Sequence, residues 1–132
     1  MNDDLKELFR LLKSHGVEFV VIGAHAVAFH SRPRMTEDID LFLGRTEENA
    51  TKLASALEEF GLPIGDKGAE KFAGSDRQMI VLGLPPFRVG LLNFAGNRTF
   101  ETIGDNRVSG KLDGVEVWFA SKDDLIEMKQ VS

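Results

Sequence analysis

Two aspartates separated by one residue are the strongest chemical feature of this sequence. Asp38 and Asp40 begin a short apolar run that ends at Leu43. Because successive side chains of a β-strand point to opposite faces, both carboxylates are predicted on one face and Ile39 on the other. Carboxylate oxygens are ligands that hard divalent cations prefer, so the pair predicts a site for Mg²⁺ or Mn²⁺. The competing interpretation is two solvated side chains at the start of a strand.

A glycine turn upstream is the second chemical feature. The apolar segment 17–22 leads into Gly23 and Ala24, and residues 24–30 are predicted to form a short helix. Glycine lets the backbone approach a ligand closely, and the free amide groups of a helix start attract phosphate. We therefore expect phosphate to bind at Gly23 and Ala24, while a tight strand-to-helix turn without a ligand remains the alternative.

Basic side chains near this turn are predicted to complete an anion site. Arg34 lies in the loop before the aspartates, where its guanidinium group can bind phosphate oxygens through two parallel hydrogen bonds. An ion pair between Arg34 and Asp38 is the other interpretation. No acid–base role is assigned to His25 or His30.

The elements that must position these residues alternate in the first half of the chain. Apolar residues at helical spacing predict helices at 3–15 and 46–60, and β-branched runs predict strands at 17–22 and from Asp38 to Leu43. Segment 17–22 is apolar throughout, which is typical of a strand buried on both faces. Segment 62–75 is rich in glycine, lysine and aspartate, and we predict a loop there.

The second half of the chain reads as hairpins followed by a helix. Segments 79–84 and 87–92 predict one antiparallel hairpin, and segments 108–112 and 115–120 predict another around Asp113 and Gly114. Ser121 is predicted to cap a closing helix. That helix is expected to turn three apolar side chains inward: Leu125, Ile126 and Met128. The order predicts an α/β or α+β domain with a mixed sheet flanked by helices.

Composition places the chain among small globular domains. Its 132 residues, 42% of them apolar, predict a single domain over residues 1–132. With 16 basic and 21 acidic residues the net charge is −5, so nucleic acid would need a local basic patch. The absence of cysteine and of a signal or membrane-spanning segment predicts a cytoplasmic protein without membrane contact.

The ordered motifs resemble one enzyme family. Gly23 and Ala24, the Arg-x-Thr-x-Asp-Ile-Asp spacing that ends at Asp40, and the segment 121–129 are similar to polymerase-β-type nucleotidyltransferases. The resemblance is to the minimal branch, particularly to small bacterial proteins related to AbiEii-type toxins.

The resemblance implies an activity and a set of site residues. It implies binding of a nucleoside triphosphate with Mg²⁺ or Mn²⁺ and transfer of a nucleotidyl group to a hydroxyl of RNA or protein. Asp38 and Asp40 would be the metal-binding and catalytic residues. The nucleotide would be bound by Gly23, Ala24, Arg34 and Lys129.

One position departs from the pattern of that family. Enzymes of that group usually read Arg-Val-Asp-Leu-Leu where this chain has Arg88-Val-Gly90-Leu-Leu, so the resemblance implies that Gly90 stands in place of a third carboxylate. The alternative function is therefore a catalytically inactive module for nucleotide sensing or protein interaction, for example in a toxin–antitoxin pair. A cognate toxin or antitoxin, or a homodimer through Met128 and Val131, is the expected protein partner.

Overall fold

The computed structural model describes residues 3–22, 38–84, 87–112 and 115–131, with only the backbone described for Phe87 and for residues 128–131. Within these residues the helices are α1 (Asp3–Ser14), α3 (Glu47–Phe60), α4 (Gly65–Ala73), α5 (Phe100–Asp105) and α6 (Lys122–Val131). The strands are β1 (Phe19–Ile22), β2 (Asp38–Leu43), β3 (Met79–Leu84), β4 (Phe87–Leu92), β5 (Val108–Leu112) and β6 (Val115–Phe119).

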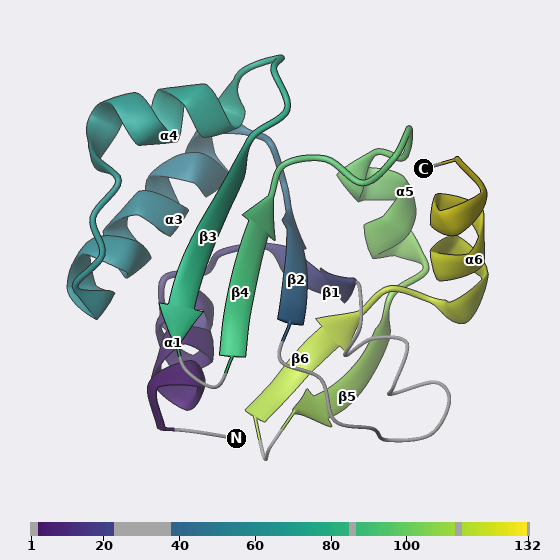
Figure 1. The fold of residues 1–132 in the computed structure, drawn as a ribbon, viewed down its shortest axis with the longest axis horizontal. Helices are drawn as coiled ribbons and strands as arrows, with labels where there is room; N and C mark the ends of the chain where they lie inside the picture. Colours follow the sequence, from purple (N-terminus) through teal and green to yellow (C-terminus); the bar gives the residue numbers. More distant parts are fainter. Residues whose placement is uncertain (1–2, 23–37, 85–86, 113–114, 132) are drawn as a thin grey trace.

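The strands form one mixed sheet in the order β3-β4-β2-β1-β6-β5. Consecutive strands pair antiparallel in three places, whereas β2 with β4 and β1 with β6 pair parallel. Figure 1 shows the sheet between α1, α3 and α4 on one side and α5 and α6 on the other. This confirms the predicted mixed sheet flanked by helices and both predicted hairpins. The turn predicted at Asp113 and Gly114 lies outside the described residues.

The core forms where the apolar stripes of the helices meet the sheet. The predicted stripe of α1 is buried, all four residues of β1 are buried, and α3 adds Leu53 and Leu57. Thr46 caps α3 by accepting a hydrogen bond from the amide of Asn49, and Gly61 ends the helix with a positive φ of 100°. None of the helices in the described parts of the chain is long and apolar enough to cross a membrane.

Two short helices were not predicted from the sequence. Segment 62–75 was predicted as a loop, which is wrong because α4 occupies most of it. α4 buries only Phe72 in full, and its other core contacts come from the small side chains of Ala69 and Ala73. Few large apolar residues therefore mark this helix in the sequence, and packing against α3 stabilises it. α5 spans six residues, a length at which periodicity is uninformative, and it begins at the capping residue Thr99.

The orientation of α6 differs from the prediction at one residue. Leu125 is buried as expected, but Ile126 is 48% exposed. The buried neighbour on the other side is Asp124, which forms an ion pair with Arg98 at 3.0 Å and accepts a hydrogen bond from Asn106. Because adjacent helical positions differ by about 100°, burying Asp124 and Leu125 turns Ile126 outward. The side chain of Met128 lies outside the described part.

Asn49 joins three segments of the backbone. Its side-chain carbonyl accepts a hydrogen bond from the amide of Glu18 at 2.7 Å, and its amide group donates to the carbonyls of Glu18 and Gly44 at 3.0 and 2.9 Å. Asn49 is buried, so these backbone groups have little access to water. The residue therefore holds the start of α3 against the start of β1 and the end of β2.

We expect Asn49→Ala to lower the free energy of unfolding by about 3 kcal/mol, because three backbone groups would lose their partner. Urea denaturation followed by circular dichroism measures this. The exposed Asn97 provides the control, since Asn97→Ala should change the value by less than about 0.5 kcal/mol. Equal effects at both positions would show that Asn49 does not hold the segments together.

Candidate functional site

Asp38 and Asp40 lie on β2, near the middle of the sheet. Between them Ile39 is fully buried, while Asp38 is exposed and Asp40 is partly buried. The alternation is the one predicted from strand parity, with the apolar side chain in the core and the two aspartates on the other face. β2 lies between β1 and β4, so residues of both neighbours flank the carboxylates.

The environment of Asp40 disfavours its charge. Partial burial, and second the negative charge of Asp38, raise the pKa of the Asp40 carboxyl above its ordinary value of 3.8. A divalent cation between the two carboxylates would offset both effects, because it supplies positive charge where water has been removed. The carboxylate oxygens of Asp38 and Asp40, and the repulsion between the two charges, therefore suit the binding of a hard cation such as Mg²⁺.

Gly90 lies directly beside Asp40. The parallel pairing of β2 with β4 sets Asp40 opposite Gly90 and Asp38 opposite Arg88. A Cβ atom built at Gly90 would lie 2.7 Å from Oδ1 of Asp40 and 3.0 Å from Cε of Met79. The Asp40 carboxylate and the end of Met79 therefore occupy the space that a side chain at position 90 would need.

Arg88 lies beside the two aspartates, although it was not among the site residues predicted from the sequence. Its place opposite Asp38 on β4 puts an exposed guanidinium group on the same sheet face as the carboxylates. The sequence contains the signal, because residues 88 and 90 share strand parity, but only the pairing of β4 with β2 brings Arg88 to this site. Arg88 adds a positive charge where a triphosphate would need one.

The remaining predicted site residues are not described. Gly23, Ala24 and Arg34 lie outside the described residues, and for Lys129 only the backbone is described. β1 ends at Ile22, which pairs with Asp40, so the predicted turn follows a residue that flanks the carboxylate. Among the described residues no three His, Cys, Asp or Glu side chains form a cluster suited to a metal ion.

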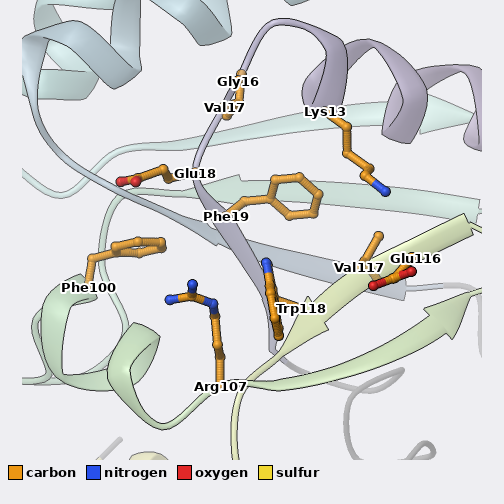
Figure 2. A pocket seen from close by; sticks show the side chains of 10 residues that line it. All are labelled: Lys13, Gly16, Val17, Glu18, Phe19, Phe100, Arg107, Glu116, Val117 and Trp118. Carbon is orange, nitrogen blue, oxygen red and sulfur yellow. The ribbon is translucent and has the colours of Figure 1, made fainter.

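A separate pocket of about 310 Å³ lies at the other end of β1. It includes Phe19, which pairs with Leu43, whereas Asp40 pairs with Ile22 at the opposite end of the strand. Figure 2 shows Arg107 on the side of Glu18 and Phe100, and Lys13 on the side of Glu116. This pocket carries two acidic and two basic side chains, so it lacks the predominantly positive lining that a triphosphate requires.

The raised pKa of Asp40 predicts a pH dependence of stability. A carboxyl group whose pKa is higher in the folded state binds its proton more tightly there, so the free energy of unfolding should fall as pH rises from the unfolded pKa through the folded pKa. Asp40→Asn should therefore raise the melting temperature at pH 7 more than at pH 4 in metal-free buffer. Asp76→Asn, at an exposed position, is the control.

Carboxyl NMR titration separates the effect of burial on the Asp40 pKa from the effect of the Asp38 charge. Asp38→Asn should lower the pKa of Asp40 but leave the part of the increase that burial causes. An Asp40 carboxyl that titrates at 3.8 in the parent protein would contradict the assignment.

Comparison with known proteins extends these observations. A protein from Thermotoga maritima, described as a candidate nucleotidyltransferase and solved by crystallography, is similar in fold with a TM-score of 0.66 and 15% sequence identity. The alignment covers 96% of this chain and 80% of that one. At this identity the match shows a shared fold. No curated protein matches the sequence.

A family model provides the assignment. The model described as "Nucleotidyl transferase of unknown function (DUF2204)" matches residues 1–130. The match therefore includes β2 with both aspartates and β4 with Gly90. The narrower resemblance to AbiEii-type proteins stays a prediction. The chain belongs to this family of nucleotidyltransferases.

Proposed function

We propose that this protein binds a nucleoside triphosphate together with Mg²⁺ or Mn²⁺ at Asp38 and Asp40, and that Gly90 limits nucleotidyl transfer. One observation carries the proposal: β2 and β4 pair so that Asp40 lies opposite Gly90, the position at which the family resemblance implies a carboxylate. The site thus retains two of the three acidic ligands that the family resemblance implies.

The residues of this site have distinct roles in the proposal. Asp38 and Asp40 would hold the cation, which when bound neutralises phosphate charge and lowers the pKa of the attacking hydroxyl. The amides of Gly23 and Ala24, with Arg34 and Lys129, would hold the phosphates, as the resemblance implies. Arg88 joins this group because it lies opposite Asp38 on the same sheet face.

Gly90 explains why binding should exceed catalysis. Two carboxylates can hold one cation with help from the nucleotide's phosphates, but a second cation near the attacking hydroxyl would lack a ligand. In addition, the Asp40 carboxylate lies over β4, in the space of the missing side chain. We therefore expect tight nucleotide binding and slow transfer.

The acceptor would be a hydroxyl of RNA or protein. A net charge of −5 makes RNA the less favourable acceptor, because it requires a basic patch that overcomes this repulsion. A hydroxyl of a protein would not need such a patch.

The second candidate function is a nucleotide-sensing or protein-interaction module without catalysis. The observation in its favour is that the described residues contain no cluster of three acidic ligands. Incorporation of labelled nucleotide into any acceptor distinguishes this module from a slow enzyme.

The proposed cation site predicts the effect of removing it. The double substitution Asp38→Ala and Asp40→Ala should weaken binding of Mg²⁺ with ATP by about tenfold or more, equivalent to about 1.4 kcal/mol, because the cation loses both protein ligands. Isothermal titration calorimetry with all four nucleoside triphosphates measures this. The matched control changes two exposed acids on α3, Glu58→Ala and Glu59→Ala, which alters the net charge equally. Equal affinities in both double variants would refute the site.

Restoring a carboxylate at position 90 should increase transfer. Gly90→Asp adds the third ligand, and we expect Mg²⁺-dependent incorporation of labelled nucleotide to rise by about 10²-fold. Gly90→Ala is the matched control, because its Cβ also displaces the Asp40 carboxylate and Met79 but adds no oxygen.

A melting-temperature measurement accompanies the assay. Gly90→Asp places a third negative charge beside Asp40, so its stability should depend more on Mg²⁺ than that of the parent. Rapid transfer by the parent protein, lost in Asp38→Ala, would show that Gly90 does not limit the reaction.

A further inference from the structure

β3 forms one edge of the sheet and lacks the features that usually protect an edge. Its sequence, Met-Ile-Val-Leu-Gly-Leu, contains no charged residue and no proline. Its register with β4 is unbroken from Met79 to Leu84, so no bulge twists it away. The opposite edge, β5, is shorter and carries Lys111. Exposed, regular and apolar edges pair with other strands unless something prevents it.

The outer side of β3 can be deduced from its pairing with β4. The amide of Asn93 donates to the carbonyl of Gln78 at 3.2 Å, one position before the pair of Met79 with Leu92 that begins the ladder. Hydrogen-bonded pairs alternate along an antiparallel ladder. The backbone groups of Met79, Val81 and Gly83 therefore point away from β4, toward the open edge.

The side chains at these positions also lack cover within the described residues. Met79 is 51% exposed and Val81 is 52% exposed, on the same sheet face as Gly90 and Asp40. The outward backbone groups can form a ladder of hydrogen bonds only with another extended polypeptide. The exposed apolar side chains favour a polypeptide whose own side chains are apolar. The edge therefore specifies a strand with the character of β3 itself.

We propose that β3 pairs antiparallel with β3 of a second copy of this chain, with the two-fold axis at Val81. In this register the outward backbone groups of Met79, Val81 and Gly83 in one copy face those of the other copy, so all three residues can form hydrogen bonds across the seam. Each Met79 then lies opposite Gly83 of the other copy. Because a Cβ at Gly83 would have no atom within 4 Å, the space around this glycine is open to the backbone of the second copy.

The absence of charged residues from β3 also favours pairing with a second copy. Self-pairing places no like charges opposite each other, because β3 carries none. A seam of five residues per copy, 79–83, is at the small end of protein interfaces, so the dimer should dissociate reversibly on the order of micromolar concentration. The seam lies two strands from β2, and both carboxylate pairs open on the same face of the joined sheet.

Light scattering and sedimentation equilibrium across a concentration series test this association. The parent protein should pass from monomer to dimer, whereas Val81→Lys should remain monomeric, because two ammonium groups would meet at the axis. Val108→Lys is the matched control: it changes the same residue type on the other edge strand, where the side chain is 37% exposed. Circular dichroism checks that both variants keep the fold.

A second experiment tests the register. The chain contains no cysteine, so single-cysteine variants give unambiguous cross-links. In Val81→Cys the two Cα atoms would be about 5.5 Å apart, within the range of a disulfide. Oxidation should cross-link Val81→Cys roughly tenfold faster than Val108→Cys or Ile80→Cys, whose side chain points to the other face.

Either of two results would overturn the proposal. One is a parent protein that stays monomeric at concentrations of about 1 mM, far above the expected dissociation constant. The other is Val81→Cys cross-linking no faster than Val108→Cys, which would leave the β3 edge to a different polypeptide. Neither result depends on nucleotide binding, so the proposed function can fail or hold independently.

Discussion

Parallel pairing between β2 and β4 is the constraint on which the candidate site depends. It joins segments about fifty residues apart in the chain and sets Asp38 and Asp40 against Arg88 and Gly90. The same strands bury Ile39, Leu41, Val89 and Leu91 on their other face. Burial of these side chains stabilises the pairing, and a one-residue slip of either strand would expose them. The packing of the core therefore fixes which residue lies beside each carboxylate.

Buried polar residues hold the ends of this sheet. Asn93, just after β4, accepts a hydrogen bond from the amide of Gln78 and donates to the carbonyls of Phe72 and Asp76. It thus connects the end of α4 to the start of β3, much as Asn49 connects α3 to β1. Both side chains satisfy backbone groups that have no partner in a helix or ladder. Such residues position the edge strand β3 beside β4 and the site.

Gly90 changes the site in more than one way. Glycine offers no ligand to the proposed cation, and its missing side chain gives room to the carboxylate of Asp40 and to the end of Met79. Partial burial and the nearby charge of Asp38 then raise the pKa of Asp40. In the proposed function, a bound cation would offset both of these effects on the Asp40 carboxylate. Family membership agrees with the nucleotidyltransferase fold, and the match includes the strands that carry the two aspartates and Gly90.

Local sequence determined most of the elements. Strand parity placed the two aspartates opposite Ile39, Thr46 and Gly61 marked the ends of α3, and Ser121 capped α6 through the amide of Asp124. These signals act over a few residues, and they were sufficient to predict both hairpins and the mixed sheet. They failed for α4, because Phe72 is its only fully buried residue and the neighbours on its apolar face, Ala69 and Ala73, are small.

Tertiary structure decided what local patterns cannot encode. The outward turn of Ile126 follows from the ion pair between Asp124 and the distant Arg98. The neighbours of the two aspartates could not be predicted either, since Arg88 and Gly90 lie opposite them only through the order of the strands. A sequence specifies which face of a strand each side chain takes, because that depends on backbone geometry alone. Which strand lies next to it depends on the burial of the whole core, so the contents of the site emerge only when the sheet is assembled.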